Sequence, residues 1–427
     1  MRRLLALFCA VALVCMSLCA CADDRAPTRE PLTIVTDGRD YTEFEKEFGK
    51  VYPEIGLRFV DGGAGDKTQR GEELFDTDTP ADIYMLTALP DASYQKKYLI
   101  DLSGYAFSER YAPSRLSECS TDGSVYLLPC GYAVLGIFYN RTLFEKYGWE
   151  APGSFAELEE LVPKIRAAGV GVSTTALDSF ESAFHYLFDL GDTTFLRTPA
   201  GLDWAEDFLD GDVSADDAWA GTIDYMQKWI DLDIINGDLL GKSAMEAASH
   251  FSEGNTAFFI TDAPFRFSQK EDGSGDRYGL LPWLSPDGSN NRYVNDTSCY
   301  YALSTELEKA SNRQKLEDAL KLMDFVSTEN GERLLSGEDA KLFSPLSGAE
   351  PGQNADRRQI VKMLNDGFGA PTVGTEWENV IDPIGEECAW WYAGETTGEH
   401  LIEVMNRAIR NSLSGGGRAN TVLLRHG

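Results

Sequence analysis

Short apolar runs alternate with segments of helical periodicity over the first part of this chain. Three of the runs predict strands: Leu32–Val35, Ile55–Val60 and Asp82–Met85. Between the first two, Phe44, Phe48 and Val51 recur at helical spacing, and Thr42 precedes Glu45 by the three residues of a capping box. Strands and helices in this alternation predict an α/β fold with a largely parallel sheet.

The same two periods continue to the end of the chain. Further strands are predicted at Val125–Pro129, Tyr132–Tyr139, Thr256–Ile260, Tyr278–Trp283 and Ser298–Ser304. Further helices are predicted at Asn312–Thr328, Gln359–Leu364, Glu376–Trp391 and Gly398–Leu413. Another helix begins at a second capping box, Ser154 with Glu157, and extends toward Gly169 with an expected kink at Pro163. The chain therefore carries strands and helices throughout.

The helical pattern also predicts whether several tryptophans lie in the core or on the surface. Trp204, Trp219 and Trp229 fit apolar helix faces, which predicts that they lie in the core. Trp390 and Trp391 are adjacent on one helix, and adjacent side chains point in different directions. At most one of that pair is therefore expected to point inward.

The start of the chain has the pattern of an export signal. Arg2 and Arg3 precede the apolar run Leu4–Ala20, and Cys21 follows a small residue. The run is no longer than the shortest segments that cross a bilayer, which favours a signal over a transmembrane anchor. Residues 18–21 resemble the bacterial lipobox, which implies that Cys21 is lipidated. We expect a signal peptide over residues 1–20 and a lipid-anchored tether over residues 21–30. The mature protein is then expected on the extracellular face of the membrane.

Length and charge limit the classes of partner. The 427 residues are 43% hydrophobic and 25% charged, as in soluble globular proteins, and are long enough for two domains. The net charge of −31 repels phosphate backbones, so nucleic acid is not expected as a partner. The excess of acidic residues is instead expected to form an acidic surface that keeps the protein soluble.

Motifs for catalysis and metal binding are missing from the sequence. Four histidines occur without an HExxH pair, and no GxSxG nucleophile motif is present. The cysteines after the signal form no CxxC pair, which argues against a zinc site. A pair of carboxylates that hydrolyses glycans stays open, because such pairs form in space. We therefore predict no catalytic residue, no metal and no cofactor.

Four cysteines remain in the mature chain: Cys119, Cys130, Cys299 and Cys388. Cys119 and Cys130 flank a predicted hairpin, and an exported protein permits a disulfide between them. A turn centred on Asp122 and Gly123, however, places Cys119 opposite Tyr126. Four separate buried thiols are the alternative, and the sequence leaves both open.

The order of several segments resembles the extracellular solute-binding proteins of ABC importers, the family that includes the maltose-binding protein. The resemblance covers residues 31–415 and depends on segments in a characteristic order: Phe44–Phe48 with Tyr52–Ile55, Thr79–Tyr84, Val125–Pro129, Ile137–Arg141 with Leu143–Phe144, Phe155–Leu158 and Asn255–Phe259. It implies a two-lobe type II periplasmic-binding-protein fold, with discontinuous lobes around a ligand cleft. The implied lobes are residues 31–135 with 301–342 and residues 136–300 with 343–415, before a tail at 416–427.

Matching positions in that family imply the residues that bind the solute. They are Asp37, Arg39, Met85, Thr87 and Tyr132 on the first side, and Glu181, Asp262, Phe265, Trp283, Asn295 and Trp377 on the second. Aromatic rings suit the apolar faces of sugars, and polar groups suit their hydroxyls. Packing in the core is the alternative for Tyr132, Phe265, Trp283 and Trp377. Arg39 has the alternative of neutralising a neighbouring aspartate.

The resemblance implies a receptor that delivers a sugar or oligosaccharide to an ABC importer by lobe closure. Its expected partners are a small-molecule ligand, ABC permease subunits and the membrane through the lipid on Cys21, and the chain is expected to be a monomer. Two alternatives stay open. One keeps the fold but binds a small non-sugar solute, and the other is a surface enzyme that degrades glycans.

Overall fold

The computed structural model describes residues 29–36, 38–61, 75, 80–86, 89–90, 92–262, 275–336, 342–349, 355–373 and 377–414. The predicted signal, Cys21 and the tail lie outside this part of the chain, as do Asp37, Thr87 and Phe265. The chain divides into two units, each assembled from several segments. Unit 1 comprises Met1–Tyr111, Cys119–Leu128 and Tyr300–Leu335, and unit 2 comprises Ala112–Glu118, Pro129–Cys299 and Ser336–Gly427. Two of the boundaries between the units, at residues 128/129 and 299/300, fall within the predicted strands Val125–Pro129 and Ser298–Ser304.

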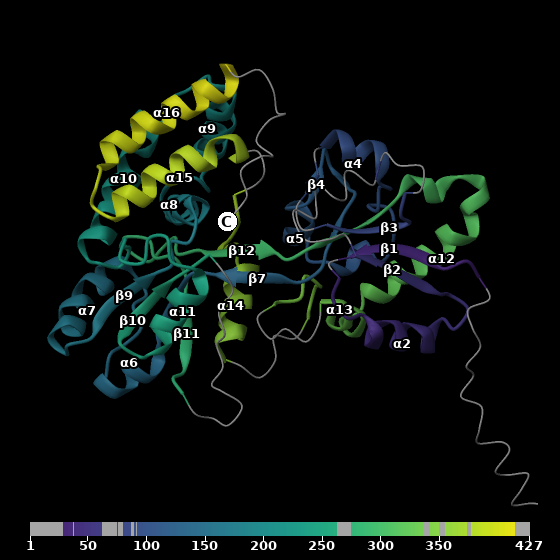
Figure 1. Ribbon diagram of the computed structural model, residues 1–427, viewed down its shortest axis with the longest axis horizontal. Coiled ribbons are helices and arrows are strands. Elements are labelled where there is room, and N and C mark those ends of the chain that lie inside the picture. The colour runs from purple at the N-terminus through teal and green to yellow at the C-terminus, as the bar shows by residue number, and fades with distance from the viewer. Residues whose placement is uncertain are drawn as a thin grey trace, which may run out of the picture. The chain divides into compact units, whose positions relative to one another are not determined.

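A five-stranded sheet in the order β2-β1-β3-β13-β6 organises unit 1 (Figure 1). Its strands are β1 (Leu32–Thr36), β2 (Leu57–Asp61), β3 (Ile83–Leu86), β13 (Tyr300–Leu303) and, where the chain passes to unit 2, β6 (Leu128–Pro129). β1 runs parallel to β2 and β3, and β13 is antiparallel to β3. The helical segments are α2 (Thr42–Val51), α4 (Ala92–Tyr98), η1 (Ser108–Arg110), η2 (Thr305–Glu308), η3 (Ala310–Asn312), α12 (Arg313–Val326) and α13 (Glu329–Ser336). The predicted α/β class is confirmed here.

The start of α2 differs from the predicted capping box. Tyr41 is the N-cap residue, and no side chain caps the helix. The hydroxyl and backbone N–H of Thr42 instead donate to Asp40 Oδ1, at 2.6 and 2.9 Å. Spacing alone predicted the box, but the preceding aspartate provides a stronger acceptor for the same threonine.

The hairpin at residues 120–125 of unit 1 has the predicted register. β4 (Ser120–Thr121) pairs with β5 (Ser124–Val125), and Ser120 lies opposite Val125. Asp122 and Gly123 form the turn with φ of 50° and 81°. A two-residue turn with both residues in the left-handed region matches the twist of a hairpin, which explains the Asp-Gly pair.

Two sheets organise unit 2. The four-stranded sheet, in the order β11-β8-β10-β9, contains β8 (Ile137–Asn140), β9 (Gly171–Thr175), β10 (Thr256–Ile260) and β11 (Tyr278–Leu281). The three-stranded sheet, in the order β14-β12-β7, contains β7 (Tyr132–Leu135), β12 (Tyr293–Thr297) and β14 (Gly369–Pro371). The predicted single strand Tyr132–Tyr139 is therefore two strands in different sheets. Gly136 lies between the two strands. A Cβ at this position would lie 2.2 Å from the carbonyl oxygen of Leu281, so only glycine fits there.

Helices surround these sheets. They are α5 (Pro113–Ser117), α6 (Arg141–Tyr147), α7 (Phe155–Ala167), α8 (Phe180–Thr194), α9 (Pro199–Asp210), α10 (Asp216–Asp231), α11 (Ala244–Ser252), α14 (Ala355–Asn365), α15 (Glu378–Tyr392) and α16 (Gly398–Ser414). Ser154 caps α7 as predicted, although Glu157 accepts from Gly153 rather than from Ser154, and the helix continues through Pro163. α15 packs against α8 and α16 (Figure 1). None of the helices in the described part of the chain combines the length and apolar character that crossing a membrane requires.

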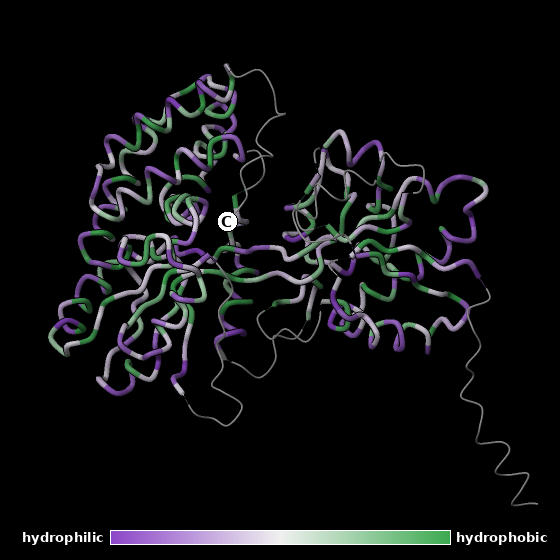
Figure 2. The backbone as a smooth tube through the Cα atoms, in the orientation of Figure 1, coloured by the Kyte–Doolittle hydropathy of each residue, from purple (hydrophilic) through white to green (hydrophobic). Residues whose placement is uncertain are grey.

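Tryptophans fill the core of unit 2 in the predicted way. Trp219 and Trp229 are fully buried, and Trp204 is 9% exposed. Trp391 is 2% exposed, whereas its neighbour Trp390 is 41% exposed, because one side of α15 faces the other helices. Figure 2 shows the matching change between hydrophobic and hydrophilic positions along α15 and α16.

A disulfide joins Cys130 to Cys299, which corrects both alternatives for the cysteines. Both residues flank the antiparallel pair β7 and β12, and the backbone N–H of Cys130 donates to the carbonyl of Cys299 at 2.9 Å. Their Cα atoms are 5.6 Å apart, as a disulfide requires. Cys119 and Cys388 are buried thiols. Nearness in sequence was misleading, because Cys119 belongs to unit 1 and Cys130 to unit 2.

Candidate ligand-binding site

One face of α8 carries a row of ionisable side chains through the interior of unit 2. Glu181, His185, Asp189 and Asp192 follow one another at intervals of four, four and three residues, which places them on the same side of the helix. The remaining positions are mostly apolar and buried, and Ser179 caps the helix by accepting from Ser182. Sequence reasoning nominated Glu181 alone. The signal for the other three was the helical spacing of charged residues within an apolar segment.

Two aspartates from other elements face the first half of this row. Asp262 follows β10, and its Oδ2 lies 3.7 Å from His185 Nδ1. Burial disfavours the charged imidazole, but hydrogen bonding to Asp262 and the charges of Asp189 and Glu181 outweigh it and raise the pKa of His185. The pKa of Asp262 is lowered: burial raises it, but hydrogen bonds from His185 and Ser182 more than compensate. The imidazolium and Asp262 therefore stabilise each other's charged forms.

Asp296 of β12 completes this group. It lies near enough to His185, Asp262 and Glu181 to feel their charges, and its pKa is raised by burial. Thr372 donates to Asp296 Oδ1 at 3.5 Å. Burial also raises the pKa of Asp189 well above its usual value. Several carboxyl groups therefore lie close to one imidazole, and burial raises the pKa of two of them, Asp189 and Asp296.

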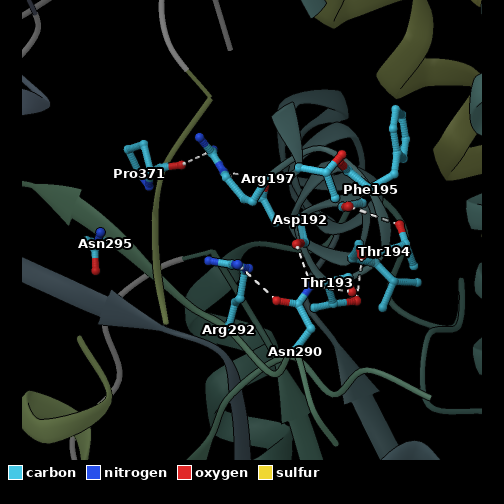
Figure 3. Close-up of polar contacts among 12 residues, drawn as sticks. Asp192, Thr193, Thr194, Phe195, Arg197, Asn290, Arg292, Asn295 and Pro371 are labelled. Atoms are coloured by element: carbon cyan, nitrogen blue, oxygen red, sulfur yellow. Dashed lines mark hydrogen bonds and ion pairs between the residues drawn. The ribbon is translucent and has the colours of Figure 1, made fainter. Parts of the chain in front are cut away.

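Two arginines lie near Asp192, the last residue of the row (Figure 3). The Nε of Arg197 donates to Asp192 Oδ1 at 2.8 Å, and its Nη2 donates to the carbonyl of Pro371 at 3.3 Å. Arg292, just before β12, donates from Nη2 to Asn290 Oδ1 at 2.9 Å. Burial raises the pKa of Asp192 to about 6, although Arg197 opposes the shift.

A third group lies at the short helix α5. Arg115 Nη2 is 2.7 Å from Glu118 Oε1, and Asn295 Nδ2 donates to the same oxygen at 3.3 Å. The guanidinium of Arg115 lies 5.0 Å from the ring centre of Tyr132. Burial raises the pKa of Glu118 to about 7 against the opposing charges of Arg115 and Arg197. The influence of Arg197 on Glu118 links this group to the previous one.

We call these three groups together the polar face of unit 2. Its members are Arg115, Glu118, Glu181, His185, Asp189, Asp192, Arg197, Asp262, Asn290, Arg292, Asn295 and Asp296. Five of the residues nominated from sequence belong to it or touch it: Tyr132, Glu181, Asp262, Trp283 and Asn295. Its carboxylates and amides accept hydrogen bonds, and its guanidinium groups and imidazole donate them.

Three nominated residues, Trp283 among them, are almost fully buried. Trp283 is 1% exposed and packs against Tyr186 and Trp229, and Trp377 is 5% exposed, with its ring centre 4.8 Å from that of Phe188. For both tryptophans the structure favours the core alternative. Met85 is 3% exposed and lines an apolar cavity of about 10 Å³ inside unit 1. Met85 and Trp377 therefore do not enter the polar face, whereas Trp283 touches it at the buried Asp189.

Arg39, also in unit 1, lies on the surface. Its guanidinium carbon is 5.9 Å from the ring centre of Tyr41. No group of three or more histidine, cysteine, aspartate or glutamate side chains is arranged to hold a metal ion within the described residues. The chemistry of the polar face is that of hydrogen bonding and ion pairing.

Comparisons with known proteins agree with this architecture. Residues 35–332 match the family model for bacterial extracellular solute-binding proteins. A candidate binding protein of Brucella abortus (strain 2308) is 24% identical over 319 residues, which cover 69% of this chain and 70% of that protein. A family 1 extracellular solute-binding protein from Bifidobacterium longum subsp. infantis superimposes with a TM-score of 0.71 at 17% identity, over 90% of this chain and 99% of the other.

A second solved structure is similar to the same extent. The bacterial solute receptor AcbH, which has an exclusive preference for β-D-galactopyranose, superimposes with a TM-score of 0.70 at 13% identity, over 90% of this chain and 98% of that one. At such identities the likeness shows a common fold. That fold is the two-lobe type II periplasmic-binding-protein fold that the sequence predicts.

Proposed function

Because the chain belongs to the family of bacterial extracellular solute-binding proteins, we propose that it is a receptor that binds a sugar or oligosaccharide and delivers it to an ABC importer. The family match over residues 35–332 is the observation that carries this proposal. The family is one of binding proteins, and the proposal assigns no bond-breaking step to the chain. The solute leaves the receptor chemically unchanged.

The chemistry of the polar face supports a solute rich in hydroxyl groups. Glu181, Asp262 and Asp296 offer carboxylate oxygens that are partly accessible, and Asn295 adds an amide. A buried hydroxyl without a partner costs about 1–3 kcal/mol, so fixed acceptors of this kind select a solute by the positions of its hydroxyls. AcbH, a receptor of similar fold, prefers a monosaccharide.

The proposal includes an anchor and a motion. Cys21 would hold the receptor on the outer face of the membrane through a lipid, and the two lobes would close around the solute before the permease recognises it. Closure requires that the solute bind the closed form more tightly than the open form. Growth of a Cys21→Ala strain in medium with labelled palmitate tests the anchor, because the label should then be absent from the protein.

Isothermal titration calorimetry of the mature chain against neutral mono- and oligosaccharides tests the binding proposal. We expect at least one saccharide to bind at micromolar concentration, and Glu181→Gln to weaken that binding about tenfold or more. Arg410→Gln is the matched control, since Arg410 is an exposed residue of α16 in the same unit. Binding of polyols or amino acids without any saccharide would favour the non-sugar alternative and overturn the assignment to sugars.

A further inference from the structure

Arg292 is a partly buried cation with no ion-pair partner among the described residues. Its Nη1 donates to the carbonyl of Gly367 at 3.2 Å, and its Nη2 donates to Asn290 Oδ1. Its Nε is buried and has no hydrogen-bond partner among the described residues. No carboxylate in that part of the chain lies within 4.0 Å of its nitrogens. A guanidinium group has five N–H donors, so Arg292 keeps donor capacity without a contacting carboxylate.

A second guanidinium lies beside it. Arg197 and Arg292 both extend to the same side of α8, and Asp192 is the acidic side chain between them (Figure 3). Burial and the charge of Arg197 both lower the pKa of Arg292, whereas Asp192 raises it. Arg197 also acts on Glu118, which Arg115 contacts, so three guanidinium groups lie near two carboxyl groups, those of Asp192 and Glu118. This local excess of positive charge stands out in a chain with a net charge of −31.

Asn290 holds Arg292 in a fixed orientation. The Nδ2 of Asn290 donates to the carbonyl of Thr193 at 2.7 Å and to that of Asp192 at 3.4 Å. These bonds direct the amide oxygen of Asn290 toward Arg292. Arg197 is held in turn by Asp192 and by the carbonyl of Pro371. Both side chains are therefore held in place before any ligand binds. This reduces the conformational entropy that the two side chains lose on binding.

We infer that Arg197 and Arg292 form a subsite for an anionic group of the ligand, so that the solute is an acidic saccharide. The inference rests on the proposed function and makes its ligand more specific. Planar guanidinium groups match the paired oxygens of carboxylate, sulfate and phosphate, and two of them beside one another suit a single anionic group. Arg197 and Arg292 then select the charged group, and the carboxylates of the polar face accept from the hydroxyls.

Calorimetry with paired ligands tests the inference on the mature chain. The arms are D-galacturonate with D-galactose, their short α-1,4-linked oligomers, and inorganic phosphate. We expect an acidic saccharide to bind at least about tenfold more tightly than its neutral counterpart, with an advantage that falls as salt increases. Arg292→Gln should remove about tenfold or more of the affinity for the acidic ligand and weaken binding of the neutral ligand by clearly less.

Two further variants separate charge from structure. Arg292→Lys keeps the charge but loses the planar fork, so we expect an intermediate affinity for the acidic ligand. Arg410→Gln removes a positive charge from an exposed position of unit 2 and should leave both affinities unchanged. Melting temperatures of all variants show whether each still folds.

Each other outcome has a defined meaning. Equal binding of neutral and acidic saccharides overturns the inference and leaves the proposed function in place, as does a loss in Arg292→Gln that is equal for both. Binding of phosphate that requires Arg292, without binding of any saccharide, supports the anion subsite and overturns the assignment to sugars. If no arm binds, both the inference and the sugar proposal are wrong.

Discussion

Removal of the disulfide between Cys130 and Cys299 is expected to destabilise unit 2. The two cysteines are 169 residues apart, and both belong to that unit. A cross-link over so long a loop strongly reduces the conformational entropy of the unfolded chain. The chain-entropy relation gives a stabilisation of the folded state of about 5 kcal/mol. Native disulfides contribute about 2–5 kcal/mol in most cases, so we expect a loss within that interval.

The double variant Cys130→Ser with Cys299→Ser measures this loss in urea, with tryptophan fluorescence as the signal. Most of the buried tryptophans lie in unit 2, so the signal reports on that unit. Reductant should shift the midpoint of the unmodified protein toward that of the double variant and leave the variant unchanged. Cys119→Ala is the matched control, because it removes a buried thiol of unit 1 that is outside the disulfide.

The reasoning would be refuted if the unmodified protein and the double variant unfolded at the same urea concentration with and without reductant. A loss of equal size in Cys119→Ala would also contradict it. That result would trace the effect to the removal of a buried sulfur atom and not to the cross-link.

Three further predictions follow from the packing and charge of unit 2. Trp391→Ala should lower the free energy of unfolding by about 3–5 kcal/mol, whereas Trp390→Ala should change it by less than about 1 kcal/mol; urea titration measures both. Gly136→Ala should lower the melting temperature because its Cβ meets a backbone oxygen at 2.2 Å, and Gly221→Ala, in the open on α10, should raise it slightly. Burial raises the pKa of Glu118 from 4.5 to about 7, so the folded state holds this proton more tightly than the unfolded chain and loses stability as pH rises through that interval. Glu118→Gln should reduce that loss by roughly 3 kcal/mol at most, which unfolding curves at pH 5, 6, 7 and 8 would show; an unchanged slope would contradict it.

Local patterns were sufficient for most of the individual elements. β10 has the predicted bounds Thr256–Ile260, and the helix predicted over Asn312–Thr328 is α12 (Arg313–Val326). The hairpin at Asp122 and Gly123 followed from a turn pair whose backbone angles few other residues adopt. In each of these segments, the interactions that determine the structure lie within a few residues of one another.

The candidate site was much less accessible from the sequence. Trp283 and Trp377 were placed in the ligand site because tryptophan suits both a sugar face and a core, and the sequence does not show what surrounds a ring. Arg197 and Arg292 were missed because 95 positions of chain separate them, although both lie beside Asp192. Their role depends on which charges are near, and that is a property of space.

The amino-acid order by itself determined the α/β class, through periodicity, and the export pattern, through local chemistry, and it carried the resemblance to solute-binding proteins through the order of its segments. The tertiary structure alone decided that residues 132–139 enter two sheets, that Cys130 pairs with Cys299, and that α8 carries a buried row of charges. Each of these depends on contacts between distant segments. Burial and opposing charge change the energy of a residue only after the chain has brought those segments together.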